Sequence, residues 1–541
     1  MPSTSASPRL ARSAGLIGAA TMTSRILGLV REQVMAYLFG AGNAVDAFNV
    51  AFRIPNLVRD LFAEGAMSAA FVPTFTTYLA RDGKPAAWRL GSNVLNALFA
   101  VTFVLVVLGI VFAEPLVRVL AGDYAEVPGK FELTVELTRV MLPFLTLVAL
   151  AAACMGMLNS LDRYFLPALA PALFNVASIT TTVMAVPVLM WMGLPTIYAM
   201  ALGVLTGGLA QLLVQWPALR REGFRHQAVL DPAEPGLRQV LLLMGPGTLG
   251  LAATQVNVFV NTWLATGEGT GAVSWLGYAF RLMYLPLGIF GVSIATASLP
   301  AISRRAAAGD LTGMRDTVSS SLAMMLTLNV PATIGLIVLA HPIVSLLFER
   351  GQFTAADTAA TAGALVAYAV GLAGYSVVKI AAPTFYALGE SRTPVLVSVL
   401  SVLTNAALNV LLVRKFGYRG LALGTSLTAL LNAGLLMLLL RRRLDGLHMR
   451  HLSSVLIRVG IASAVMGMTA WGLDRELHVW MPGTALPIQI ARVGLAIGGA
   501  LLALGASLKV LRVTEFTGVV SSVAARLRRS PESEVRSPKS E

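Results

Sequence analysis

The sequence predicts an all-α polytopic membrane protein of about 14 transmembrane helices, grouped as two six-helix lobes and two C-terminal helices. Three observations predict this fold class. The chain of 541 residues is 56% hydrophobic and only 13% charged, whereas a soluble protein of this size carries about 25% charged residues. Apolar segments long enough to cross a bilayer recur from one end of the chain to the other. Finally, the two halves resemble each other at a fixed spacing.

Fourteen segments have the length and the apolar character of membrane spans. They lie near 16–39, 44–80, 92–113, 137–158, 165–190, 195–219, 238–264, 271–303, 318–340, 358–388, 393–413, 419–440, 453–473 and 485–508. The second and eighth are longer than a bilayer requires, so we expect them to project beyond it or to bend. The expected organisation is a cytoplasmic segment (1–15), two lobes (16–225 and 226–445), a helix pair (446–512) and a disordered cytoplasmic tail (513–541).

Basic residues predict the orientation of these spans. With the N-terminus in the cytoplasm, the loops rich in Arg and Lys lie on the inner side and the acidic loop at 114–136 lies outside. This agrees with the positive-inside rule, except for RKFGYRG at 414–420. An even number of spans also leaves the C-terminus in the cytoplasm. Loop bias accounts for the formal charge of +14, and we predict no nucleic-acid partner.

Three matches at one spacing indicate an internal repeat. AVDAFNVAFRI at 44–54 resembles AVSWLGYAFRL at 272–282, Pro73 corresponds to Pro300, and LDRYFLPAL at 161–169 resembles LGESRTPVL at 388–396. A shift of 227 or 228 residues covers six predicted helices, so the two halves share an orientation. Parallel repeats of this kind occur in transporters that rock two lobes around a central site. The alternative is chance similarity among apolar helices.

Redox and metal chemistry find little support in the sequence. Cys154 is the single cysteine, so no disulfide can form within the chain. The five histidines form no ligand-spaced pair within a predicted span. We therefore predict no metal site and no cofactor. The polar, basic start of the chain lacks a cleavage motif, so we predict no removable signal peptide.

Polar residues follow one face of the predicted second helix. They are spaced three and four residues apart, with Arg59 beside the stripe and Glu64 continuing it: Asp46, Asn49, Arg53, Asn56 and Asp60. Such residues are costly within a membrane and mark functional sites. The alternatives are that they lie beyond the bilayer or neutralise one another in a static Arg–Asp network.

Further arginines lie in other predicted spans. Arg25 and Arg31 are on the first helix, and Arg281 is the repeat equivalent of Arg53, on one face with Ser274. Snorkelling to an interface is the alternative for the first two, and pairing with neighbouring carbonyls is the alternative for Arg281. Lys379 and Arg492 lie close enough to span ends to snorkel. Arginine offers a fixed fork of donors suited to phosphate, so the set predicts a site for an anionic headgroup with apolar walls for a lipid tail.

Several segments carry a resemblance to a known family. SRILGLVREQVMAYLFGAG, DAFNVAFRIPNLVRDLFAEGAMSAAFVPTF and VSWLGYAFRLMYLPLGIFGVSIATASLP resemble the MurJ (MviN) lipid II flippases of the MOP superfamily, which also includes MATE exporters and Wzx flippases. The resemblance extends to about residue 512. It implies a cargo of undecaprenyl-diphosphate-linked disaccharide-pentapeptide, moved from the inner to the outer leaflet of the bacterial cytoplasmic membrane for cell-wall synthesis.

The resemblance also implies roles for individual residues. Arg25, Arg31, Arg59 and Arg281 match required arginines of the family, and Asp46, Asn56 and Ser274 match other important polar positions. We add Arg53 to the predicted substrate-binding set, and Asn49, Asp60 and Glu64 to a gating or charge network with Asp46. The last two spans are implied to form a groove for the polyprenyl tail. Where some relatives flank the arginine with acids, this chain has Phe280 and Tyr284 beside Arg281.

We therefore expect transport by alternating access, with membrane lipids and cell-wall synthesis proteins as further partners and with the membrane potential able to bias the cycle. An exporter of cationic drugs or another lipid-linked oligosaccharide, as in MATE or Wzx proteins, is the alternative within transporters. A membrane glycosyltransferase would need catalytic acids or a metal on a substantial outer loop, and the acidic loop at 114–136 shows no ordered motif. A scaffold would not need a charged cavity.

Overall fold

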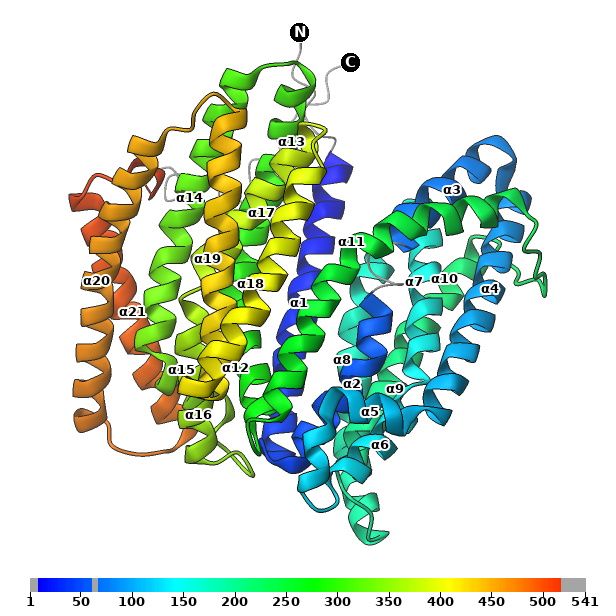
Figure 1. The fold of residues 1–541 in the computed structure, drawn as a ribbon, viewed down its shortest axis with the longest axis horizontal. Coiled ribbons are helices and arrows are strands. Elements are labelled where there is room, and N and C mark those ends of the chain that lie inside the picture. Colours follow the sequence, from blue (N-terminus) through cyan, green and yellow to red (C-terminus); the bar gives the residue numbers. More distant parts are fainter. Residues whose placement is uncertain (1–7, 61–66, 517–541) are drawn as a thin grey trace, which may run out of the picture. The chain divides into compact units, whose positions relative to one another are not determined.

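A computed structural model describes residues 8–60 and 67–516, and these residues are helical almost throughout. The described residues form two compact units (Figure 1), one within residues 1–275 and 348–357 and the other within residues 276–347 and 358–541. The first unit therefore includes a short segment that lies far along the sequence. The predicted lobe boundary at 225/226 stays a prediction.

Among its described residues, the first unit contains eleven complete helices and a 3-10 turn. They are α1 (Pro8–Phe39), α2 (Asn43–Arg59), α3 (Met67–Arg81), α4 (Gly83–Val111), α5 (Ala113–Ala121), η2 (Gly122–Glu126), α6 (Lys130–Met141), α7 (Phe144–Ser160), α8 (Phe165–Trp191), α9 (Tyr198–Leu213), α10 (Trp216–Arg221) and α11 (Pro235–Thr266). The unit boundary then falls inside α12 (Ala272–Pro286), after Trp275.

The second unit contains the rest of α12 and the following elements. They are the π-helical turn η3 (Leu287–Gly291), α13 (Val292–Ala307), α14 (Leu311–Val338), α15 (Ala340–Phe348), α16 (Ala355–Ala369), α17 (Leu372–Ala387), α18 (Arg392–Phe416), α19 (Tyr418–Arg443), α20 (Met449–Trp480) and α21 (Leu486–Val510). Of these, α15 and α16 contribute their adjoining ends to the first unit. The last two helices form an antiparallel hairpin (Figure 1).

The order of helices repeats along the chain at the spacing that the sequence predicts. Helices α1 and α11 start 227 residues apart, and so do α5 and α15 and also α8 and α18. Each pair also has a similar length. The repeat therefore includes short helices as well as spans, and α20 and α21 follow it as an additional pair.

Ten helical segments of the described residues are long and apolar enough to cross a membrane, and an eleventh is the pair α16–α17, bent by 42°. The predicted spans 16–39, 44–80 and 238–264 do not pass this test, although all three are helical where they are described. The first two carry four of the five arginines predicted to bind substrate, and 44–80 includes residues outside the described part. The all-helical polytopic class is confirmed, and the total of fourteen spans stays a prediction.

The structure corrects the expectation for the acidic segment 114–136 and adds detail to the eighth predicted span. The acidic segment 114–136, expected to lack an ordered motif, forms α5, η2 and the first half of α6. Its apolar residues Val117, Leu120 and Tyr124 are buried and pack with Val50 of α2, which explains why it folds. The eighth predicted span is long and is interrupted after Pro286 by the π-helical turn, as proline inside a helix removes a hydrogen bond.

Candidate functional site

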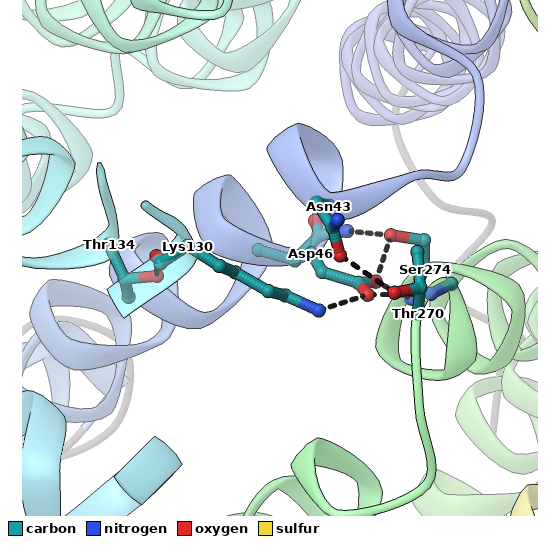
Figure 2. Close-up of polar contacts among 8 residues, drawn as sticks. Asn43, Asp46, Lys130, Thr134, Thr270 and Ser274 are labelled. Atoms are coloured by element: carbon teal, nitrogen blue, oxygen red, sulfur yellow. Dashed lines mark hydrogen bonds and ion pairs between the residues drawn. The ribbon is translucent and has the colours of Figure 1, made fainter. Parts of the chain in front are cut away.

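Asp46 lies at the centre of a buried polar cluster in the first unit (Figure 2). Its side chain is 0% exposed. Oδ1 accepts hydrogen bonds from the backbone N–H (3.0 Å) and the hydroxyl (2.7 Å) of Ser274. Oδ2 accepts from the backbone N–H of Gly271 (2.7 Å) and from the ammonium of Lys130 (3.0 Å). The carboxylate therefore connects three segments: α2, the start of α6 and the start of α12.

A glycine turn and the free N–H groups at the start of α12 explain this arrangement. Gly271 has a φ of +93°, a conformation that glycine adopts easily, and it turns the chain from α11 into α12. A carboxylate close to the first N–H groups of a helix satisfies donors that have no partner within the helix and is stabilised by the helix dipole. Here the carboxylate comes from another helix, so capping α12 also holds α12 against α2.

Two further contacts support this capping interaction. Asn49, one turn after Asp46, donates from Nδ2 to the Ser274 hydroxyl (3.3 Å), and Thr270 donates to Oδ1 of Asn43 (2.8 Å) (Figure 2). The Ser274 hydroxyl therefore accepts from one side chain of α2 and donates to another. We call Asn43, Asp46, Asn49, Lys130, Thr270, Gly271 and Ser274 the Asp46 cluster.

A second contact holds the same end of α12. The indole N–H of Trp275 donates to Oδ1 of Asp357 (2.9 Å), the third residue of α16. Oδ2 of Asp357 accepts from the backbone and hydroxyl of Thr354, which is the reciprocal capping arrangement of a helix start. In the same loop, the N–H of Gln352 donates to the carbonyl of Tyr37 at the end of α1 (2.9 Å).

The predicted arginines of the first unit lie in two environments. Arg25 and Arg53 are exposed. Arg31 is 19% exposed, forms an ion pair with Glu32 (2.8 Å) and lies over the ring of Phe174. Arg59 donates from Nε (3.0 Å) and Nη2 (2.7 Å) to Asp60, which also accepts from Gln255 of α11 (3.3 Å).

Arg281 belongs to the second unit, where it lies on α12 and is exposed. The aromatic residues beside it form their own cluster. Phe280 lies 5.5 Å from Tyr284 and 5.3 Å from Tyr368 between ring centroids, the latter pair edge to face. Phe280 therefore packs the second half of α12 against the end of α16, and Tyr284 lies beside it on α12.

An apolar cavity of about 400 Å³ lies in the second unit between α14, α20 and α21. Its lining includes Phe290, Leu336, Met466, Ala470, Leu501 and Leu504, and Thr327 is its one hydroxyl-bearing residue. That hydroxyl donates to the carbonyl of Ala323 (2.8 Å) and is therefore satisfied. A cavity with no unpaired donor or acceptor from this side chain suits a hydrocarbon occupant.

Residues 35–491 match the family described as "Lipid II flippase MurJ". The chain belongs to this family. The "Lipid II flippase MurJ" of Burkholderia cenocepacia is 36% identical over 78% of this chain and 82% of its own length. The "Probable lipid II flippase MurJ" of Vibrio cholerae serotype O1 is 34% identical over 88% of this chain and 91% of its own length.

Solved structures share the fold of this MurJ family member. "Lipid II flippase MurJ, inward closed conformation" superposes with a TM-score of 0.74 at 24% identity, covering 92% of this chain and 99% of that chain. An inward-facing MATE family multidrug transporter of the MOP superfamily gives a TM-score of 0.64 at 16% identity, over 80% of this chain and 98% of that one. These likenesses concern the fold alone.

The structure brings some predicted residues together and adds others. Asp46, Asn49 and Ser274 meet in one cluster, whereas Asn56 lies further along α2, with its Oδ1 buried and without a hydrogen-bond partner in the described part of the chain. Glu64 lies outside the described residues. Lys130, Thr270 and Asn43 were missed. Lys130 had a signal, since Lys130, Thr134 and Thr138 form a polar stripe at helical spacing, and all three are buried.

Proposed function

We propose that this protein is a lipid II flippase, which moves the undecaprenyl-diphosphate-linked peptidoglycan precursor from the inner to the outer leaflet of the bacterial cytoplasmic membrane. Membership in the MurJ family over residues 35–491 carries this proposal. The protein acts as a transporter and not as an enzyme. We further propose that both termini are cytoplasmic, because this orientation places the basic loops inside.

The arginines are proposed to bind the diphosphate of the cargo. Arg25, Arg31, Arg53, Arg59 and Arg281 offer planar forks of donors that match phosphate oxygens, and Asn56 and Ser274 complete the proposed set. Arg59 and Asp60 are 27% and 31% exposed, and a partly exposed ion pair contributes little stability. Exchanging this carboxylate for a phosphate therefore costs little, so binding and release both remain accessible.

The apolar cavity is proposed to hold part of the polyprenyl chain. It is bordered by α20 and α21, the two helices that follow the repeat. A long hydrocarbon gains about 25 cal/mol for each Å² of apolar surface removed from water, so it stays in an apolar environment while the headgroup crosses. Keeping the tail beside these helices leaves only the polar headgroup to be moved.

The Asp46 cluster is proposed to act as a latch in an alternating-access cycle. The carboxylate holds the start of α12 through three hydrogen bonds from residues 271–274. Opening this end of the protein requires these bonds to break. The cycle would therefore alternate between a state in which the bonds are formed and a state in which they are broken. Asn49, Asp60 and Glu64 are the further members of the proposed charge network.

Complementation of a bacterium depleted of its own lipid II flippase tests this function, with the lipid II in the outer leaflet quantified at the same time. We expect the wild type to restore growth and outer-leaflet lipid II. Arg25→Ala, Arg59→Ala and Arg281→Ala should leave the precursor in the inner leaflet at matched membrane levels. Arg118→Ala is the matched control, since Arg118 is 65% exposed and pairs with Glu114 of its own helix.

Two results would count against the proposal. If the wild type reaches the membrane but restores neither growth nor outer-leaflet lipid II, the cargo is wrong. A wild type that instead lowers the susceptibility of cells to cationic drugs would indicate a MATE-like exporter. If the wild type complements and all three arginine variants do so too, the cargo assignment stands and the cationic site does not.

A further inference from the structure

Lys130 occupies a position that local rules disfavour. It is the first residue of α6, directly after Gly129 with a φ of +74°, and a cation at this end of a helix is repelled by the helix dipole. Its side chain is nevertheless 2% exposed. A buried charge of this kind is kept only where a partner compensates it. A conflict with a local rule often marks a functional position.

Two neighbours compensate the ammonium of Lys130. Nζ lies 3.0 Å from Oδ2 of Asp46 and 3.9 Å from the centroid of the Tyr124 ring. Tyr124 is itself 1% exposed, so the ring face replaces water around the ammonium. The start of α6 therefore places a buried ammonium group beside the carboxylate that caps α12.

The four partners of the Asp46 carboxylate are all hydrogen-bond donors. They are two backbone N–H groups, one hydroxyl and one ammonium. A protonated carboxyl group would point its own O–H at a donor, so this arrangement requires the ionised form. An ionised carboxylate in a dry site needs a countercharge, and Lys130 is the cation in contact with it.

We propose that Lys130 is a positioning residue of the transport cycle: it keeps the Asp46 carboxylate charged and oriented to accept the N–H groups of Gly271 and Ser274. Lys130 thereby sets how firmly the start of α12 is held against α2. The inference rests on the proposed function, in which this latch opens during each cycle.

Hydrogen–deuterium exchange of a peptide covering 268–276 measures the latch directly, because two of its amides donate to Asp46. The full-length protein is reconstituted in lipid nanodiscs without lipid II. We expect Lys130→Met to raise exchange of this peptide about tenfold or more, as for loss of a charge-assisted hydrogen bond. Lys130→Arg should restore most of the protection. Lys84→Met is the matched control, since Lys84 is 54% exposed in its pair with Glu222.

A set of double variants separates positioning from a purely structural ion pair. If Lys130 acts through Asp46, then Lys130→Met combined with Asp46→Asn should exchange no faster than Asp46→Asn alone. The charge swap of Lys130→Asp with Asp46→Lys keeps an ion pair but puts a side chain without acceptors beside the N–H groups. We expect the swap to fold, as judged by gel filtration and circular dichroism, and still to leave 268–276 unprotected.

Three results would overturn the inference. They are unchanged exchange of 268–276 in Lys130→Met, additive effects in the double variant, and full protection in the swap. If Lys130→Met does not fold, Lys130→Gln and the swap provide the same comparison. Because exchange is measured without lipid II, its outcome is independent of the cargo. Failure of complementation by the wild type would instead count against the proposed function alone.

Discussion

The first turns of α2 and α12 are equivalent in the internal repeat, yet the chain holds them in different ways. In the first half, Lys130 at the start of α6 donates to Asp46 on α2, and both side chains are buried. In the second half, Asp357 near the start of α16 accepts from Trp275 on α12, and both side chains are only partly buried. The start of the later helix thus carries the cation in one half and the anion in the other.

The buried charges of the two helix starts lie in the first half of the chain, in the Lys130–Asp46 pair. Asp46 and Ser274 occupy corresponding positions, 228 residues apart, and they bond to each other. The two halves therefore contribute unequal partners to one contact: a carboxylate from one and a helix start with a hydroxyl from the other. The Trp275–Asp357 contact supports the same helix start with a carboxylate that is only partly buried, so less charge has to be desolvated.

The largest expected effect comes from removing the charge at Asp46. Asp46→Asn leaves Lys130 buried without a countercharge, and breaking a buried ion pair costs about 3–5 kcal/mol. We expect a clear fall in Tm and loss of complementation. Asp357→Asn is the matched variant in the other half, and it should cost only about 0.5–1.5 kcal/mol, because the amide oxygen can still accept hydrogen bonds at this partly exposed site and no buried cation loses its partner. Thermal unfolding in detergent measures both.

Equal losses of stability for Asp46→Asn and Asp357→Asn would contradict this comparison. Such a result would mean that the two helix starts contribute alike and that burial of the Lys130–Asp46 pair adds nothing. A larger effect at Asp357 would reverse the ranking of the two regions.

Some of this arrangement could be predicted from the sequence, for physical reasons. The repeat was visible because helices of equal length and equal turns leave a constant spacing. The stripe from Asp46 to Asp60 was visible because helical periodicity collects polar residues on one face. The stripe of Lys130, Thr134 and Thr138 indicates a polar helix face, but it does not indicate that this face is buried. The burial depends on α5 and η2 packing against α2, which is a tertiary contact. The Asp357 contact joins residues 82 positions apart, which no local pattern specifies.

A smaller effect is expected where the 348–357 segment closes on the end of α1. Gly40 has a φ of +68°, and a Cβ there would lie 2.5 Å from the carbonyl oxygen of Gln352. Gly40→Ala should therefore cost about 1–3 kcal/mol through backbone strain. Gly42→Ala is the control, since a Cβ at Gly42 meets nothing within 4 Å. Thermal unfolding compares the Tm values of the two variants. Equal values would show that the 348–357 segment shifts to accommodate the added Cβ without loss of stability.

The smallest expected effect is that of Trp275→Phe, which removes the indole N–H and keeps an aromatic ring. The hydrogen bond from Trp275 to the Asp357 carboxylate is partly exposed and contributes about 1 kcal/mol, and Asp357 retains its bonds from Thr354. We expect a small fall in Tm, continued complementation and unchanged exchange of the amides that donate to Asp46. Because Trp275 directly follows Ser274, this variant tests whether neighbouring residues of one helix turn are held independently. A rise in exchange as large as that of Asp46→Asn would mean that the two contacts form one cooperative latch, and that the partly exposed contact of the second half is as necessary as the buried ion pair of the first.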